Sequence, residues 1–241
     1  LAADVTTTGT QTYTGAVTIN GATRTLTTTG NNVTFSSTVN SDATAARGLN
    51  IATGTAATVQ FNGVVGGTYA LDVIQITGTS AALDLNAAIL NGASAAGAAS
   101  LSVSGASNLG ADVTTTGTQT YTGAVTLSAN VTLTTTSNGA VNLVETINGD
   151  YDLTINTHGT GDTTFGNAVG GSTALNNITI NTDVFTAAAI KADGTLSITN
   201  LNASTISGIL SQASALALTK LGAGNLTLTA VNTYTGATTI S

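Results

Sequence analysis

The sequence predicts an all-β chain wound as a β-solenoid, and three observations carry this prediction. The 241 residues contain a long internal near-duplicate, many short segments in which apolar and small polar residues alternate, and no Pro. Alternation places successive side chains on opposite faces of a strand. The absence of Pro leaves every backbone N–H able to join a strand ladder.

The composition separates this chain from disordered and nucleic-acid-binding proteins. It is 41 % hydrophobic and 6 % charged, whereas disordered chains are poor in apolar residues and rich in charge and Pro. The net charge is −7 and Cys is absent, which excludes disulfides and thiolate metal sites. The basic residues Arg24, Arg47, Lys191 and Lys220 are too few to bind a phosphate backbone or an anionic membrane. We expect no nucleic-acid partner and no cofactor.

Internal repeats define the organisation of the chain. Residues 1–18 recur at 109–126 with one difference, Ala2 against Gly110. Further on, the residues kept at an offset of 104 are apolar or Gly, as in Leu49, Ile51, Phe61, Gly66, Gly67, Ala70, Leu71, Ile74 and Ile76 against Leu153, Ile155, Phe165, Gly170, Gly171, Ala174, Leu175, Ile178 and Ile180. We divide the chain nominally into repeat 1 (1–108), repeat 2 (109–219) and the start of a third repeat (220–241), within one continuous solenoid.

Each repeat is expected to consist of short strands joined by tight turns. Alternating segments are predicted as strands at 16–19, 59–61, 73–76, 101–103, 196–198 and 226–228. Turn signals stand between such segments at Asn20-Gly21, Asn62-Gly63, Asn91-Gly92 and Asn148-Gly149. The Ala-rich run 81–99 is the best rival for a helix, but its Gly, Asn and Ser residues lower helix propensity.

Short strands with Gly and Asn turns also fit a sandwich or a barrel. Tandem sandwich domains are expected to show a linker between copies, yet residues 101–109 keep their strand and turn pattern into the second copy. A solenoid is therefore favoured. One turn of the solenoid, called a rung below, takes roughly 20 to 25 residues, so we expect about ten or eleven rungs.

The chain shows no export or anchoring segment of its own. No run of about 18 apolar residues is present, so no membrane insertion is predicted. The start LAADVTTTGT lacks the basic and apolar regions of a signal peptide, and the sequence contains no Met. We expect it to be a segment of something longer.

The C-terminal residues KLGAGNLTLTAVNTYTGATTIS closely resemble the autotransporter-associated β-strand repeat of bacterial passenger domains, K-x-G-x-G-x-L-T-L-x-x-x-N-T-Y-T-G-x-T-x-I. The matching residues are Lys220, Gly222, Gly224, Leu226, Thr227, Leu228, Asn232, Thr233, Tyr234, Thr235, Gly236, Thr238 and Ile240. The pattern F-x-x-x-V-G-G that begins at Phe61 is similar to repeats of very large exoproteins and filamentous-haemagglutinin-like adhesins. The resemblance implies a right-handed parallel β-helix, exported by a Gram-negative bacterium to the cell surface or the extracellular space.

The densest acidic group, Asp150, Asp152 and Asp162, is the strongest candidate for chemistry. Stacked in successive rungs, these carboxylates could bind Ca²⁺ or form an acid/base pair. Asp residues are also common in Gly/Asn turns, and we favour that interpretation. His158 is the only histidine, which leaves no multi-His metal site, and we expect it in an exposed turn.

Other recurrent polar residues are interpreted as structural. Tyr13, Tyr121 and Tyr234 share one repeat position, which favours packing with a hydrogen-bonded hydroxyl over a sugar-binding role. Regular T-x-T arrays can bind ice, but the Thr runs at 6–8, 27–29 and 134–136 are irregularly spaced, and strand propensity explains them. Sequons at Asn32, Asn130, Asn177, Asn202 and Asn225 permit glycosylation, although they arise by chance in such a composition.

We therefore predict a structural, non-enzymatic protein with no catalytic, cofactor-binding or metal-binding residues. Its expected role is that of a stalk, filament or matrix fibre in adhesion or biofilm cohesion at the surface of a Gram-negative bacterium. Expected partners are further copies of the chain or its continuation in a longer chain, and host or cell-surface glycans. The alternative is a carbohydrate-active enzyme or glycan-binding module on the same scaffold.

Overall fold

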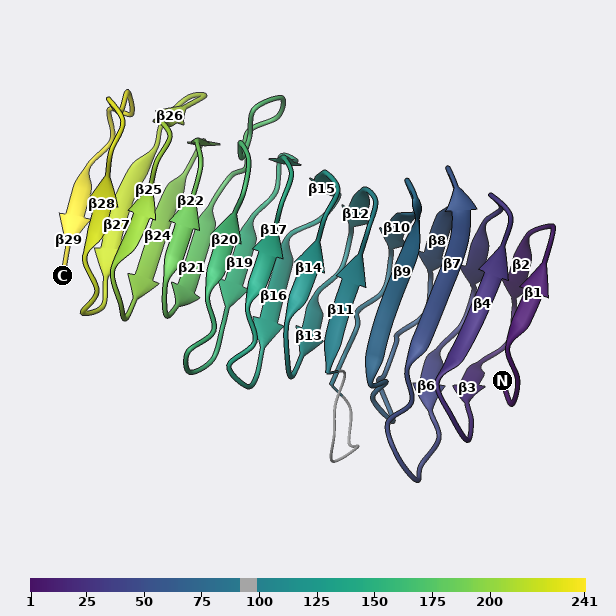
Figure 1. The fold of residues 1–241 in the computed structure, drawn as a ribbon. Helices are drawn as coiled ribbons and strands as arrows, with labels where there is room; N and C mark the ends of the chain where they lie inside the picture. The colour runs from purple at the N-terminus through teal and green to yellow at the C-terminus, as the bar shows by residue number, and fades with distance from the viewer. Residues whose placement is uncertain (92–98) are drawn as a thin grey trace.

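The computed structural model describes residues 1–91 and 99–241, and the regular structure within them consists of strands. Figure 1 shows these strands stacked side by side into an elongated shaft, with the two termini at opposite ends. Each strand pairs with the strand that follows one rung later, and the paired strands are parallel because the chain crosses each face in the same direction in every rung. The predicted all-β solenoid is confirmed.

Each full rung contributes one segment to each of three faces. Face A is one 11-stranded sheet, so the expected ten or eleven rungs are confirmed. Its strands are β1 (Val5–Thr7), β4 (Arg24–Thr28), β7 (Leu49–Thr55), β9 (Val73–Thr79), β11 (Ser100–Val103), β14 (Gln119–Tyr121), β17 (Val141–Leu143), β20 (Thr163–Phe165), β22 (Phe185–Ala187), β25 (Ser204–Ile206) and β28 (Leu226–Leu228).

Faces B and C complete the rungs. Face B contains β2 (Gln11–Tyr13), β5 (Val33–Phe35), β8 (Thr58–Phe61), β10 (Ala82–Leu85), β12 (Ser107–Leu109), β15 (Val125–Leu127), β18 (Ile147–Asn148), β23 (Ile190–Ala192) and β26 (Leu210–Gln212). Face C contains β3 (Val17–Ile19), β6 (Val39–Ser41), β13 (Val113–Thr115), β16 (Val131–Thr135), β19 (Leu153–Asn156), β21 (Ile178–Thr182), β24 (Thr195–Asn200), β27 (Ala217–Leu221) and β29 (Thr238–Ile240). Single bridges at Val65 and Ile89 on face C and at Val169 on face B join the strand groups of each face.

The core lies inside the shaft and is built from columns of like residues. On face C, Ile155, Ile180 and Ile198 pair in register and are fully buried. On face B, the rings of Tyr13, Phe35 and Phe61 stack with centroids 5.0 Å apart at each step. Apolar residues fill these columns because every second side chain of a strand points inward.

The glycines kept between the copies occur where a side chain has no room. Gly66 and Gly170 both have φ near +70°, in equivalent loops of the two repeats. A Cβ at Gly170 would lie 2.0 Å from the carbonyl oxygen of Lys191, and one at Gly66 would lie 2.5 Å from that of Leu90. Both the backbone angle and the close approach of the next rung therefore require Gly.

The two copies of the near-duplicate lie on different faces. Gln11–Tyr13 belongs to face B, whereas its copy Gln119–Tyr121 belongs to face A. Val17–Ile19 is on face C, and its copy Val125–Leu127 is on face B. The offset of 108 residues does not contain a whole number of rungs, so the repeat is displaced by one face around the axis.

The individual strand predictions agree with the structure where it describes the chain. Four of the six predicted strand segments match an observed strand to within one residue at both ends, and the segments 73–76 and 196–198 lie inside the longer strands β9 and β24. The Ala-rich run contains β10 instead of a helix, and it continues into residues 92–98. These residues, and with them part of the predicted Asn91-Gly92 turn, lie outside the described part of the chain.

Phe35→Ala is expected to destabilise the protein by about 3–5 kcal/mol, because it removes the middle ring of the stack on face B and leaves a cavity. Thr34→Ala is the matched control: its side chain points outward from the same strand, and a change within about 0.5 kcal/mol is expected. Chemical denaturation of both variants measures the difference. Equal midpoints for the two variants would contradict the packing described here.

Candidate functional site

The acidic residues singled out in the sequence do not converge. Asp152 lies just before β19, where its Oδ1 accepts hydrogen bonds from the backbone and side-chain nitrogens of Asn177 at 2.9 and 3.0 Å. Asp162 lies beyond the other end of β19, and its Oδ1 accepts from the Val184 backbone at 3.1 Å. Asp150 is exposed, next to Asp152. Within the described residues, no group of three or more His, Asp or Glu side chains could hold a metal ion.

Asp152 is one member of a side-chain ladder that runs along the corner before face C. In each of four successive rungs, an Asp or Asn oxygen accepts a hydrogen bond from a backbone N–H of the next rung. The accepting residues are Asp112, Asn130, Asp152 and Asn177, at distances of 2.7 to 3.0 Å. These bonds join residues 18 to 25 positions apart, so the side chains link successive rungs and do not close local turns as expected from the sequence. Two of the five sequon asparagines, Asn130 and Asn177, take part.

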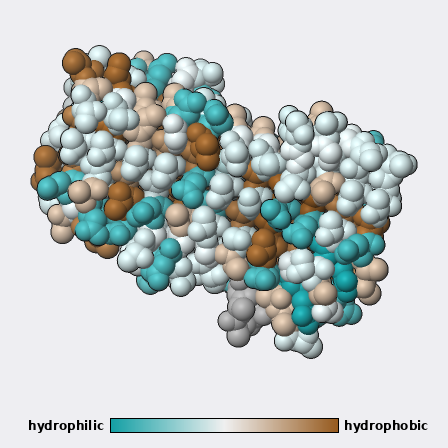
Figure 2. All heavy atoms as spheres, viewed as in Figure 1, coloured by the Kyte–Doolittle hydropathy of each residue, from teal (hydrophilic) through white to brown (hydrophobic). Residues whose placement is uncertain are grey.

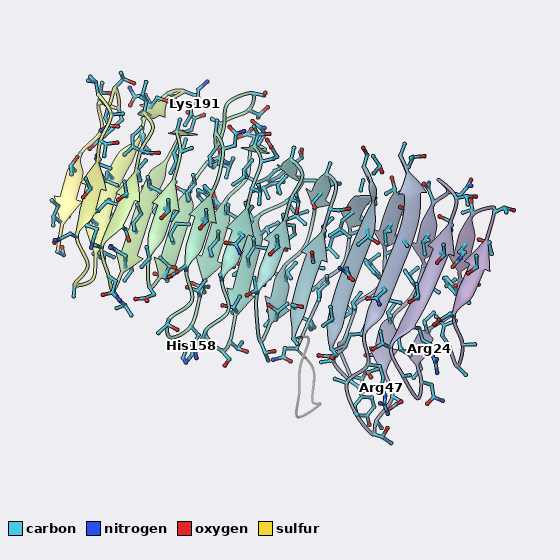
Figure 3. The ribbon with its side chains drawn as sticks, in the orientation of Figure 1. Arg24, Arg47, His158 and Lys191 are labelled. Carbon is cyan, nitrogen blue, oxygen red and sulfur yellow. The ribbon has the colours of Figure 1, made fainter. Side chains whose placement is uncertain are left out.

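His158 stands apart from this ladder. Its side chain is exposed, and its backbone carbonyl accepts hydrogen bonds from Asn138 and Gly161. Figure 3 shows His158, Arg24 and Arg47 along one edge of the shaft and Lys191 along the other. Arg47 pairs with Asp42 at 3.2 Å. These groups do not form a basic patch in this view.

A buried Gln–Tyr pair forms a hydrogen-bonded polar cluster in the core. Gln119 Nε2 donates to the carbonyl of Val113 at 3.2 Å, to the hydroxyl of Thr115 at 3.2 Å and to the carbonyl of Thr134 at 2.9 Å. Gln119 Oε1 accepts from the Tyr121 hydroxyl at 3.2 Å. Both side chains are fully buried. Burial raises the pKa of the Tyr121 phenol well above its ordinary value, because the phenolate loses its hydration.

The first repeat builds the same pair at its own corner. Gln11 donates to the carbonyls of Val5 and Thr27 and to the hydroxyl of Thr7, and the Tyr13 hydroxyl donates to Gln11 at 2.9 Å. Tyr234, the third copy, lies at the last rung and shares a 2.8 Å hydrogen bond with the Thr238 hydroxyl. The packing role expected for Tyr13 and Tyr121 from the sequence agrees with this geometry.

Threonines and Gly turns extend the buried polar corner. The hydroxyls of Thr115, Thr135 and Thr157 donate to the carbonyls of Gly117, Gly139 and Gly161, at 2.6 to 2.7 Å, in three successive rungs. The Gly161 carbonyl also accepts hydrogen bonds from the Thr182 hydroxyl and the Asp183 backbone, both at 3.0 Å. The T-x-G and T-x-x-x-G spacings in the sequence therefore mark the corners of the solenoid.

Two polar features were missed by sequence reasoning. Lys220 points into the core on face C, in the same column as Ile198, and its ammonium donates to the carbonyls of Leu221 and Gly222. Desolvation lowers its pKa. In the alternating segment A-L-T-K-L, Lys220 occupies an inward position like Leu218. This pattern could have predicted that the Lys220 side chain points into the core. It lines a cavity of about 560 Å³ at the last rung, together with Leu226, Tyr234 and Ile240.

The second missed feature is a polar column on the outside of face B. Asp84 accepts hydrogen bonds from Gln60, Asn108 and Asn86, at 2.8, 2.9 and 3.2 Å. Partial burial acts to raise the pKa of Asp84, but the three amide hydrogen bonds outweigh it and the net shift is downward. Gln60 and Asn108 come from the two neighbouring rungs and Asn86 from the same rung, so the carboxylate links three adjacent rungs.

Gln119→Met is expected to cost about 3 kcal/mol of stability, because it leaves the buried Tyr121 hydroxyl and two backbone carbonyls with fewer partners at similar side-chain volume. Gln11→Met is the matched control. It breaks the same contacts in the first rung, where Tyr13 is only half-buried and water can replace them. A loss of about 1 kcal/mol is expected there. Thermal and urea unfolding compare the two, and a larger loss for Gln11→Met is the contradicting result.

The raised pKa of Tyr121 makes the protein less stable in alkali. Unfolded Tyr ionises near pH 10, while the folded phenol keeps its proton, so the free energy of unfolding should fall as pH rises above about 10. Tyr121→Phe removes this contribution and should flatten the slope between about pH 10 and 11.5. Urea unfolding at stepped pH measures both slopes; identical slopes would show that Tyr121 ionises freely in the fold.

Comparison with known families gives one match. Residues 218–241 match the family model of the passenger-associated-transport-repeat, which confirms the resemblance seen at 220–241. No curated protein and no solved structure matches the chain. The likeness of the Phe61 pattern to filamentous-haemagglutinin-like adhesins stays a prediction.

The matched segment contains almost all of β27 and the whole of β28 and β29, which make up the last rung and the strand before it. Such a repeat implies a secreted or surface-exposed protein of Gram-negative bacteria. Among the described residues there is no helix with the length and apolar character needed to cross a membrane. The C-terminal end of this β-solenoid is thus similar to a passenger-associated-transport-repeat.

Proposed function

We propose that this chain is a shaft segment of a bacterial surface protein and that it serves adhesion or biofilm cohesion by spanning distance. The observation that carries the proposal is the passenger repeat at 218–241, which is stacked in register on the rung before it. The same strand pairing runs through the whole of face A. A stack of this kind extends along one axis, and each rung contacts its immediate neighbours.

The distribution of polar groups supports a structural role. The candidate acids Asp152 and Asp162 lie at different corners and each accepts a hydrogen bond from the next rung, and the buried Gln119–Tyr121 pair is hydrogen-bonded within the protein. Figure 2 shows a surface dominated by residues of intermediate hydropathy, with hydrophobic residues in small separate groups. These features favour the shaft over the alternative of an enzyme or glycan-binding module.

Self-association belongs to the same proposal. The strands β1 and β28 stand at the two edges of the face A sheet, and each has one neighbour within it. Unpaired edges of parallel strands accept a further strand. Further rungs, supplied by a longer chain or by a second copy, are the partners that fit these edges.

The test is the removal of single whole rungs from the natural chain displayed on Gram-negative cells. Deleting 119–140 removes β14, β15 and β16 and brings β17 onto β11, which keeps all three faces aligned. Deleting 141–162 removes the next rung and is the matched control. If the segment is a shaft, both variants should remain accessible to antibody on intact cells and retain adhesion and biofilm mass.

Two results would contradict this function. Absence of the segment from the surface of intact cells excludes a displayed shaft. Loss of adhesion with one deletion but not the other, at equal surface display, places a specific binding site in the deleted rung. Circular dichroism of the purified variants shows whether each still folds.

A further inference from the structure

The turn Asn20-Gly21, between β3 and β4, has a charged side chain bonded to each end of its peptide group. The Gly21 N–H donates to Asp42 Oδ2 at 2.9 Å, and the Asn20 carbonyl oxygen accepts from Arg24 Nη2 at 2.6 Å. Gly21 has φ +77°, and Arg24 Nη2 lies 3.4 Å from the position that a Cβ on Gly21 would take. The guanidinium therefore packs directly against this turn.

Both charges are present at neutral pH. Hydrogen bonds from the Thr44 hydroxyl, the Gly21 N–H and the Thr44 N–H hold the pKa of Asp42 well below its usual value. Arg24 is always protonated, and its Nε is buried without a hydrogen-bond partner. Within the residues that the structure describes, Arg24 forms no ion pair, since Asp42 is paired with Arg47.

This arrangement favours the loss of the proton from the Gly21 N–H. A deprotonated peptide nitrogen shares its negative charge with the carbonyl oxygen of the same peptide group, because the two are conjugated. Asp42 is placed to accept the proton, and Arg24 is placed to stabilise the charge that develops on the Asn20 oxygen. The Gly21 nitrogen then becomes a nucleophile, and the side-chain amide carbon of Asn20 is close enough in sequence to form a cyclic imide with it.

The Asn20 side chain is free to reach this nitrogen. It is exposed and makes no hydrogen bond within the described residues. The other Asn-Gly pairs that the structure describes in full begin at Asn62, Asn138 and Asn148, and each side-chain oxygen accepts a hydrogen bond from the next rung at 2.9 to 3.1 Å. In that part of the chain, no charged side chain is bonded to their peptide groups.

The second copy of the repeat lacks this arrangement. At the offset of 108 residues, Ser128 and Ala129 replace Asn20 and Gly21. No Lys or Arg occurs between residues 48 and 190, so the copy of the turn has no arginine after it either. The turn between faces C and A therefore forms without the Asn-Gly pair and without the arginine, and the cluster at Asn20 is not a requirement of the rung.

We propose that Asn20-Gly21 is a self-modification site, at which the asparagine amide is converted to a carboxylate. The Gly21 nitrogen bonds to Cγ of Asn20 as its proton passes to Asp42, and the Cγ–Nδ2 bond breaks. Nδ2 takes up the proton from Asp42 and leaves as ammonia. Water then opens the cyclic imide at either carbonyl, which gives aspartate or isoaspartate at position 20, next to the unpaired guanidinium of Arg24. This inference does not depend on the proposed shaft function.

The first test compares the Asn-Gly pairs within one chain. The purified, folded protein is incubated in mildly alkaline buffer and mapped by mass spectrometry of its peptides, which detects the change from amide to acid. Conversion of Asn20 should be faster than conversion of Asn62, Asn138 and Asn148. In the chain unfolded by urea, the four rates should become similar, because the contacts that distinguish the sites are lost.

The second test removes the charge that faces the peptide oxygen. Arg24→Met should slow the conversion of Asn20 about tenfold, which is the effect on a rate of losing one charge-assisted hydrogen bond. Arg47→Met is the matched control: Arg47 bonds to Asp42 but not to the peptide group of the turn, and the rate at Asn20 should be unchanged. Circular dichroism shows whether both variants fold.

Two results would overturn the proposal. The first is conversion of Asn62, Asn138 or Asn148 at a rate equal to or above that of Asn20 in the folded, unaltered chain. The second is an equal rate at Asn20 in the two folded arginine variants. The first comparison needs no substitution, so it decides the question even if Arg24→Met does not fold.

Discussion

The stacking of each rung on the one before it, in register, is the constraint on which the rest of this structure depends. Parallel pairing repeats the same backbone hydrogen bonds at every step. Each side chain must therefore pack against the residue one rung away as well as fit its neighbours in sequence. Columns of Ile on face C and the stacked rings of Tyr13, Phe35 and Phe61 follow from that rule. The glycines follow from it as well, because Gly170 has no space for a Cβ beneath the next rung.

The same constraint explains which features could be predicted from the sequence. Core and turn residues recur because each must fit the rung above and below, so the repeats revealed the strands, the rung number and the passenger-like end. Side-chain neighbours across rungs were harder, because turns differ in length. The ladder that contains Asp152 joins residues 18 to 25 positions apart. Such partners become visible only when the register of every rung is known.

The buried Gln119–Tyr121 pair and the corner threonines find their hydrogen-bond partners within the shaft itself. Gln119 joins Tyr121 to three groups on neighbouring strands, and the corner threonines bind the carbonyls of the turns. A buried donor without a partner costs more than a hydrogen bond gains, so these networks fix the positions of the corners. What remains available to partners is the outer surface of the three faces.

The displacement of the repeat by one face has a geometric consequence for anything that approaches the shaft from the side. The motif of Gln11–Tyr13 faces one direction, its copy at Gln119–Tyr121 faces another, and Tyr234 returns to the first, as the bond from Thr233 to Leu210 of β26 shows. Tyr13 and Tyr234, which are 221 residues apart, therefore lie on the same face. Because the repeat does not contain a whole number of rungs, its copies lie on two different faces around the axis. Faces A and B of the shaft thus present the same sequence pattern at different heights along the axis.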